Sequence, residues 1–286
     1  MALLMIASLI WAFSFGLIKK YLGGLDAGFV AFVRLALASF LFLPLLRLGK
    51  KSAAAAWRLF IIGMMQFGLM YVFYIQSFRF LAAHQVALFT IFTPLYVTLV
   101  DDLWEKRFRP RHLWTALLAV AGTAIIVYSS WQSKNFWSGF FLVQASNMCF
   151  AVGQLAYRRL LPCQPGWQAR HGFAWLYMGG TLAALLAMLF LSNPFRLSLN
   201  VGQLLVLLYL GLLASGIGFF LWNIGATRVE AGILAVCNNV KVPLAMLVSL
   251  LFFGEHTDWL RLLGGGSIIA LALWLNYSRD RSISVL

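Results

Sequence analysis

Apolar runs of about 17–25 residues recur along the whole chain, and this is the length at which an α-helix crosses a bilayer. We expect ten such helices: Ala2–Ile18, Gly28–Leu46, Trp57–Phe78, Gln85–Val100, Leu113–Ser130, Trp137–Tyr157, Phe173–Leu191, Gln203–Ala226, Ala231–Phe253 and Trp259–Tyr277. No soluble domain fits between them. The sequence therefore predicts an all-α integral membrane protein with ten transmembrane helices.

The charged residues support a membrane location. Only 10% of the residues are charged, whereas soluble domains carry about 25%. A net charge of +14 would suggest nucleic acid in a soluble chain. Here the basic residues gather in short loops, so we expect a lipid bilayer and no nucleic-acid partner. Fourteen of the 22 Lys and Arg residues lie on the predicted side of the N-terminus and six on the other. The positive-inside rule then predicts a multi-pass protein of the inner (cytoplasmic) membrane with both termini in the cytoplasm.

Lys241 is the residue of the predicted helices whose insertion into a membrane should cost the most free energy. It lies about ten residues into the apolar run Ala231–Phe253, with Asn238 and Asn239 before it. A lysine at such depth costs roughly 2.5–3.5 kcal/mol on insertion scales. No acidic residue is expected at similar depth, so the carboxylate of a passing solute is the simplest partner. A neutral amine, which could itself carry a proton, and an amine bonded to backbone carbonyls are the alternatives.

The two halves of the chain share an ordered pattern. A mid-helix proline is followed by a glutamate at the helix exit and then by a glycine-containing apolar helix. The pattern runs through Thr93–Leu95, Leu103–Glu105 and Ala119–Gly122, and again through Val242–Leu244, Phe253–Glu255 and Leu263–Gly266. We place the boundary in the widest gap, so that residues 1–157 form the first five-helix repeat, 158–172 the connecting loop and 173–286 the second repeat. An odd number of helices per repeat makes the two copies inverted, as in many secondary transporters.

This series resembles the EamA-type domain of the drug/metabolite transporter superfamily. Trp11–Phe15 with Lys19, and Phe32–Leu35, are similar to the first two helices of that domain. The resemblance covers nearly the whole chain. It implies ten helices and a transporter of small metabolites, often an exporter of amino acids or related compounds. Lys241 departs from the family pattern, which would make the substrate particular to a subgroup.

Other residues join Lys241 as candidates. Arg34 lies about six residues into its helix and either contacts the substrate or has a structural role, reaching outer headgroups or a loop carbonyl. Pro94 and Pro243 each remove a backbone donor, which should free the carbonyls of Thr90 and Asn239 at a kink near the midplane. The remaining candidates are polar or aromatic side chains at helical depth: Gln144, Asn147, Asn238 and Asn239 for polar contacts, and Tyr74 and Trp222 for an aromatic wall. Helix–helix hydrogen bonding and packing are the alternatives for these residues. His84 is the candidate protonation switch, or an interfacial residue.

The predicted function is secondary transport, in the direction of export, of a small zwitterionic or anionic metabolite by alternating access. Amino acids and their derivatives, opine-type metallophores among them, fit a carboxylate site at Lys241. The alternative is a membrane enzyme acting on a lipid or isoprenoid, for which Asp101, Asp102 and Glu105 are the only candidate acids. The chain has no phosphate-binding loop, no metal-ligand spacing and no nucleophile–base set, so we expect no cofactor and no metal. Gly264–Gly266 would allow close packing and a homodimer contact.

Overall fold

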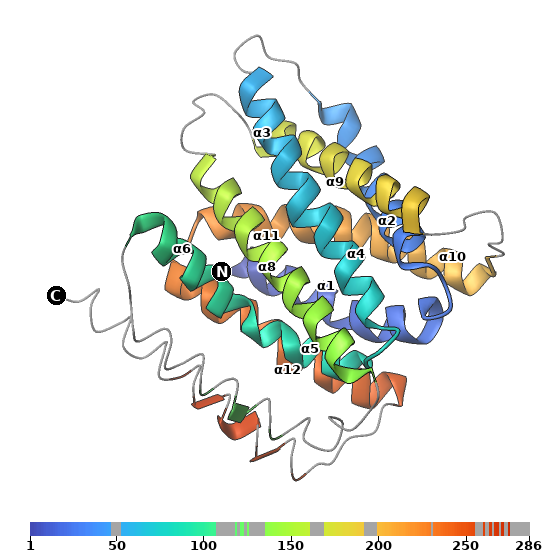
Figure 1. Cartoon of the computed structure of the whole chain (residues 1–286), viewed down its shortest axis with the longest axis vertical. Helices are drawn as coiled ribbons and strands as arrows, with labels where there is room; N and C mark the ends of the chain where they lie inside the picture. Colours follow the sequence, from blue (N-terminus) through green and yellow to red (C-terminus); the bar gives the residue numbers. More distant parts are fainter. Residues whose placement is uncertain are drawn as a thin grey trace.

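The protein is described from a computed structural model that covers residues 1–46, 53–106, 135–160, 169–191, 199–229 and 231–254, with isolated residues between 118 and 125 and between 260 and 274. Every regular element in these ranges is helical (Figure 1). The elements are α1 (Ala2–Leu17), η1 (Ile18–Leu22), α2 (Ala27–Phe42), η2 (Leu43–Leu45), α3 (Ala53–Gly63), η3 (Met64–Leu69), α4 (Met70–Ser77), α5 (Ala83–Phe89), η4 (Thr90–Phe92), α6 (Thr93–Glu105), α8 (Phe136–Leu160), α9 (Ala169–Leu191), α10 (Val201–Leu208), η8 (Tyr209–Ile217), α11 (Gly218–Thr227) and α12 (Ala231–Phe253).

Seven of the described helical stretches are long and apolar enough to cross a membrane. They are Ala2–Leu22, Ala27–Leu45, Ala53–Ser77, Ala83–Glu105, Phe136–Leu160, His171–Phe190 and Val201–Thr227. The helix α12, with 23 residues, is of similar length. The all-helical membrane fold is therefore as predicted. The predicted fifth and tenth helices, Leu113–Ser130 and Trp259–Tyr277, lie almost wholly outside the described residues, so the count of ten stays a prediction.

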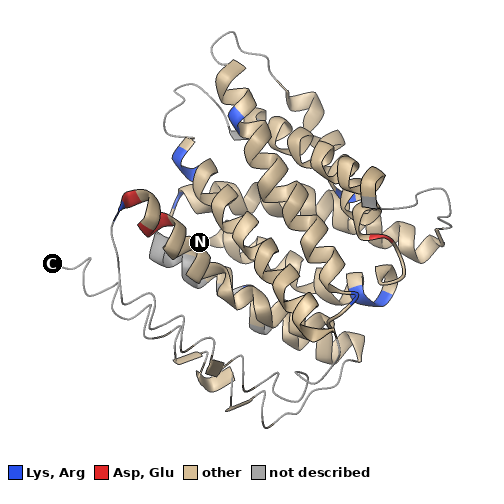
Figure 2. Ribbon diagram, in the orientation of Figure 1, with Lys and Arg blue, Asp and Glu red and all other residues tan. Residues whose placement is uncertain are grey.

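Charged residues lie mostly towards the ends of the helices (Figure 2), and Arg34 and Lys241 are exceptions buried within α2 and α12. Asp26 illustrates why: its carboxylate caps α2 by accepting from the backbone N–H groups of Gly28 and Phe29, at 2.7 and 3.1 Å. An anion at a helix N-terminus is favoured by the helix dipole. At the same end of the bundle, the Lys19 amine donates to the carbonyls of Phe78 and Leu81, at 2.8 and 2.9 Å. These contacts fix where helices begin and end.

Three of the membrane-length helices contain π-helical turns, in which the backbone bonds to the fifth residue instead of the fourth. The segment η1 ends the first long helix, whereas η3 and η8 lie inside the stretches Ala53–Ser77 and Val201–Thr227. A π turn widens the helix and re-aims its side chains, and such turns often occur at functional sites. The element η4 is instead a tighter 3-10 turn between α5 and α6.

The helices pack in pairs that are distant in sequence (Figure 1). The helix α1 lies against α12 and α11, α2 against α9 and η8, and α8 against α4 and α6. The approach of α3 to α9 is especially close. A Cβ atom added at Gly63 would meet the backbone carbonyl of Leu176, and one added at Gly179 would meet that of Phe60. Small residues allow such approach between membrane helices, where dispersion and interhelical hydrogen bonds replace the hydrophobic effect.

Candidate substrate-binding cavity

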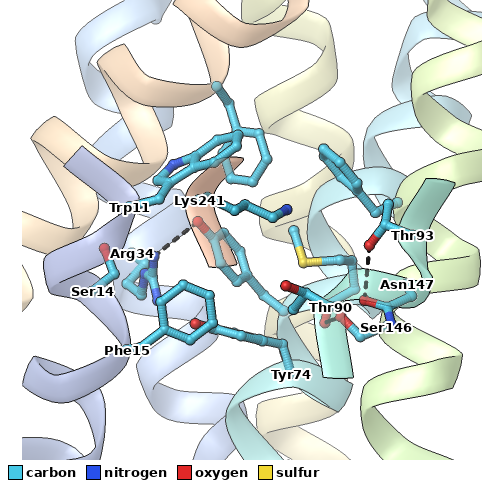
Figure 3. Close-up of a pocket in the computed structure, with 14 residues that line it drawn as sticks. Trp11, Ser14, Phe15, Arg34, Tyr74, Thr90, Thr93, Ser146, Asn147 and Lys241 are labelled. Carbon is cyan, nitrogen blue, oxygen red and sulfur yellow. Dashed lines mark hydrogen bonds between the residues drawn. The ribbon is translucent and has the colours of Figure 1, made fainter. Parts of the chain in front are cut away.

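A cavity lies inside the bundle. Its lining comes from seven of the long helices and consists of Trp11, Ser14, Phe15, Arg34, Met70, Tyr71, Tyr74, Thr90, Thr93, Ser146, Asn147, Phe150, Phe219 and Lys241 (Figure 3). Both intramembrane cations of the sequence are in this list. None of the described lining residues is acidic.

Arg34 is buried, with a side chain only 1% exposed. Its Nη2 donates to the Tyr71 hydroxyl at 2.8 Å and its Nε donates to the Ser215 hydroxyl at 3.2 Å. The guanidinium also lies 4.1 Å from the centre of the Tyr71 ring. Its third nitrogen, Nη1, is buried without a hydrogen-bond partner. The expectation that Arg34 reaches lipid headgroups is wrong, because Tyr71 and Ser215 hold it inside the bundle.

Lys241 lies on α12, about halfway along the helix, and is 7% exposed. Its amine is surrounded by three aromatic rings, at 5.5 Å from the centre of Trp11, 5.4 Å from Phe150 and 5.9 Å from Trp222. Aromatic faces attract cations, more strongly where water is excluded. The described part of the chain supplies this aromatic cage to the Lys241 amine but no carboxylate beside it.

Four predicted residues lie in or directly behind the cavity wall. Tyr74 lines the cavity, with its ring 5.7 Å from that of Phe15. Asn147 also lines it, whereas Gln144 stands one turn away and accepts from the Asn147 amide at 3.2 Å. Trp222 forms part of the cage around the Lys241 amine and is itself fully buried.

Other predicted residues lie elsewhere. Asn238 is fully buried on α12 and its amide donates to the Leu234 carbonyl, but it does not line the cavity. His84 lies in the first turn of α5, buried but away from the cavity lining. The side chains of Asn239 and Pro243 lie outside the described residues, although the helix α12 runs through both positions.

The predicted free carbonyl at Thr90 is wrong. Pro94 does interrupt the helix, because α6 begins with it at its first turn and the 3-10 turn η4 precedes it. The tighter turn, however, lets the backbone N–H of Thr93 donate to the Thr90 carbonyl. A 3-10 bond thus replaces the α-helical bond that proline cannot make.

The side chains of several lining residues were not put forward as substrate contacts: Trp11, Ser14, Phe15, Met70, Tyr71, Thr90, Thr93, Ser146, Phe150 and Phe219. The tryptophan lies within the motif Trp11–Phe15, which marked the first helix. The small hydroxyl residues carry little sequence signal, because serine and threonine in membrane helices usually bond their own backbone. Their significance becomes visible only when α5, η4, α6 and α8 are brought together.

Amide side chains outside the cavity connect the helices. Gln66 donates to Asn223 at 3.1 Å, and the Trp222 indole donates to Gln154 at 2.7 Å. These two bonds join the stretch Ala53–Ser77 to α11, and α11 to α8. Gln66, Asn223 and Gln154 therefore take part in hydrogen bonds between helices, which is the common role of amide side chains in membrane helices.

The π segment η8 is tied to the cavity by side chains from other helices. The Trp11 indole donates to the Ala214 carbonyl at 2.8 Å. The Tyr177 hydroxyl shares its proton between the carbonyls of Ser215 and Gly216, at 2.6 and 2.8 Å. The hydroxyl of Ser215 meanwhile accepts from Arg34. Three successive backbone carbonyls of η8 are therefore bonded by side chains outside this segment.

A family model described as the EamA-like transporter family matches residues 1–128 and 137–277. The chain belongs to the EamA-like transporter family. This membership confirms the predicted drug/metabolite transporter resemblance, and the protein is a multi-pass membrane transporter and not an enzyme.

Relatives of this EamA-like transporter carry more specific names. It is 40% identical over 278 residues to a protein named "Biotin transporter" from Escherichia coli (strain K12), which covers 96% of this chain and 92% of the relative. The "Biotin transporter" of Salmonella typhimurium is also 40% identical over 278 residues, with the same coverage. A "Probable biotin transporter" from Pseudomonas aeruginosa is 42% identical over 285 residues, covering 99% of both chains. A solved crystal structure with 18% identity superposes with a TM-score of 0.74 over 98% of this chain and 97% of its own, which supports the fold.

Proposed function

We propose that this transporter carries biotin, with the carboxylate of the substrate bound between Arg34 and Lys241. The observation that carries the proposal is the pairing of two buried cations in one cavity whose described lining contains no acidic residue. The relatives named biotin transporters support the choice of this carboxylate over others. Biotin combines one carboxylate, an apolar chain and a compact fused ring with two ureido N–H groups.

The charge of the lining argues against an amino acid. A zwitterion brings an ammonium group, and the described lining offers it two cations and no anion. The Thr90 carbonyl, which the sequence predicted to be free, already accepts a backbone hydrogen bond and is not available to an ammonium. A monocarboxylate without an ammonium therefore fits better than the amino acid or opine expected from the sequence.

The remaining walls suit the apolar parts of such a molecule. Trp11, Phe15, Tyr74, Phe150 and Phe219 give the cavity broad aromatic surfaces. Trp11 lies 4.8 Å from Phe219 between ring centres, so the rings form a continuous wall. Such surfaces would enclose the hydrocarbon chain and thioether ring of biotin, since apolar and aromatic walls with a few placed polar groups are typical of ligand pockets.

Transport by alternating access would follow from two inverted five-helix repeats. The helix contacts support this architecture. If predicted helices one to four are matched in order with helices six to nine, a contact between two helices has a counterpart between the two matching helices. Under that matching, the contact of α4 with α8 becomes that of α1 with α11, and the contact of α3 with α9 becomes that of α2 with η8. The contact of α1 with α12 becomes that of α8 with α6. The π segments η3 and η8 also fall in matching helices.

We place the repeat boundary between residues 128 and 137 instead of at residues 158–172. Six of the ten predicted apolar runs precede Arg158, so a boundary there does not divide them equally. The two matches to the family model end and begin around the earlier position. Each repeat would then hold five helices, and the odd number makes one repeat inverted relative to the other. The charge distribution of the loops supports an inner-membrane location with both termini in the cytoplasm.

The test is counterflow of radiolabelled biotin into liposomes that contain the purified protein and excess unlabelled biotin. Counterflow reports exchange in both directions and so does not depend on the direction of transport in the cell. Lys241→Met should weaken biotin affinity by at least about thirtyfold, because removing one partner of a buried charge pair costs about 2–5 kcal/mol. Lys20→Met is the matched control, since Lys20 is exposed at the end of the first long helix.

Two results would contradict the proposal in different ways. Absence of biotin counterflow by the wild-type protein would refute biotin as the substrate. Biotin counterflow that is equally strong in the wild type and in Lys241→Met would refute the carboxylate site. The thermal unfolding transition of each variant checks that a variant without flux is still folded. A titration with biotin in the same assay tests whether the variant still binds, because a ligand that binds the native state raises the unfolding temperature.

A further inference from the structure

We infer that four side-chain oxygens of the cavity, from Thr90, Thr93, Ser146 and Asn147, recognise N–H groups of the transported molecule. We call these four residues the acceptor wall. The inference rests on the proposed function and adds to it a specificity site for the ureido ring, across the cavity from Arg34 (Figure 3). All four residues line the cavity and are at most 6% exposed.

Two of the hydroxyls have already donated their only proton. The Thr90 hydroxyl lies 2.7 Å from the Ala87 carbonyl, and the Ser146 hydroxyl lies 3.0 Å from the Met70 carbonyl. A carbonyl oxygen can only accept, so each hydroxyl must be the donor. Each of these oxygens can therefore only accept a hydrogen bond from a ligand, through its lone pairs.

The hydrogen bonds of Thr93 and Asn147 also leave their side-chain oxygens as acceptors. The Asn147 amide nitrogen lies 2.9 Å from the Phe89 carbonyl, which sets the orientation of the amide because only the nitrogen can donate. The Asn147 oxygen then lies 3.2 Å from the Thr93 hydroxyl, which must donate to it. The Thr93 oxygen therefore also presents only lone pairs, and the Asn147 oxygen keeps capacity for a second donor.

The cavity is consequently polarised. The acceptor wall comes from η4, α6 and α8, and in Figure 3 it lies across the cavity from Arg34, with the Lys241 amine pointing towards it. The Nη1 of Arg34 is a donor without a partner. Donors thus meet an anion at one side, and acceptors meet N–H or O–H groups at the other.

A cyclic urea on a carboxylic acid matches this polarity. Its two N–H groups would donate to the acceptor wall while its carboxylate lies at the cations. A carboxylic acid of similar size without N–H groups would satisfy the cations and leave the acceptor wall without donors. Each lost hydrogen bond should weaken binding by about three- to tenfold, the range that such bonds contribute in proteins.

The experiment compares three unlabelled competitors in biotin counterflow. Desthiobiotin keeps the ureido N–H groups and the carboxylate but lacks the sulfur. Lipoate keeps a carboxylate and a sulfur ring but has no N–H group. For the wild-type protein we expect desthiobiotin to compete about as well as biotin, and lipoate to compete at least tenfold less well.

The variant Thr90→Val removes one acceptor and keeps the shape of the side chain. It should lower the affinity for biotin and desthiobiotin by about three- to tenfold and leave that for lipoate unchanged. Thr98→Val is the matched control, because Thr98 makes the same bond to the carbonyl three residues earlier, at 2.9 Å, but does not line the cavity. Ser146→Ala, on the other helix of the wall, gives a second reading if Thr90→Val unfolds.

The inference is overturned if lipoate competes as well as biotin with the wild type. It is also overturned if Thr90→Val and Ser146→Ala weaken lipoate and biotin equally, because the wall would then act through packing. Failure of the proposed function has a different signature, namely no counterflow of biotin by the wild-type protein at all.

Discussion

Replacing Arg34 by methionine should remove substrate recognition without destabilising the fold. The two groups that accept from Arg34 do not lose their partners, because the Tyr71 and Ser215 hydroxyls bond each other at 2.9 Å. Methionine fills a similar volume and carries no charge that must be desolvated. Exchange of buried ionic groups for apolar residues of similar size is often neutral, or stabilises by about 1–4 kcal/mol. The unfolding temperature of Arg34→Met should therefore equal or exceed that of the wild type.

Binding should respond in the opposite direction. The Nη1 group has no partner in the protein, so a substrate carboxylate can gain a hydrogen bond to a charged donor there. Such bonds contribute about 1.5–3 kcal/mol, which corresponds to roughly 10- to 150-fold in affinity. The loss should apply to biotin and not to biotin methyl ester, which lacks the negative charge.

The assay combines thermal unfolding of the detergent-solubilised protein with competition by biotin and its methyl ester in counterflow. Tyr71→Phe is the comparison, because it takes away the acceptor of Nη2 and keeps the buried charge. That variant should unfold at a lower temperature, since an unsatisfied buried donor costs about 1–3 kcal/mol and more when it is charged. The reasoning is refuted if Arg34→Met unfolds at as low a temperature as Tyr71→Phe, or if it discriminates the acid from the ester as strongly as the wild type does.

Three further predictions concern stability and topology. Gly63→Val should lower the unfolding temperature, because the added side chain would meet a backbone carbonyl and overpacking costs about 1–3 kcal/mol. Gly24→Ala is the control and should leave the unfolding temperature unchanged, because a Cβ atom there meets no atom within 4 Å. Trp222→Phe should cost about 1–3 kcal/mol of stability in the same assay by removing an indole donor from a buried amide, while an unchanged unfolding temperature would speak against that bond. Reporter fusions at Lys106 and Lys134 should read cytoplasmic and external respectively, and the reverse pattern would overturn the proposed orientation.

The sequence predicts the membrane helices well because length and apolarity are sufficient for a chain that must satisfy its own backbone in lipid. Lys241 could also be found, since a charge in the middle of an apolar run is conspicuous at any orientation. Lys241 lines the cavity, and the role proposed for it is that of a substrate contact.

Arg34 shows that the position of a residue along its helix does not determine which groups its side chain contacts. Its position along the helix suggested the outer interface, yet its surroundings are decided by Tyr71 and Ser215, which come from other helices. Thr90 shows a second limit. The rule for proline gives the bond that is lost, whereas the 3-10 turn that restores a partner depends on local relaxation of the backbone. The acceptor wall could not be predicted for both reasons, because its polarity depends on backbone carbonyls of α4 and α5 that accept from its side chains.

The bonds around η8 connect cavity shape to helix pitch. Trp11 is at once a wall of the cavity, a part of the cage around the Lys241 amine and the donor to the Ala214 carbonyl. A solute that displaces this indole also releases a backbone carbonyl, and a change of pitch in η8 displaces the indole in turn. The free energy of binding can thus drive a movement of this helix as well as hold the solute in place. Changes at Trp11 should for this reason alter the turnover rate in addition to affinity, whereas changes at the acceptor wall should alter affinity alone.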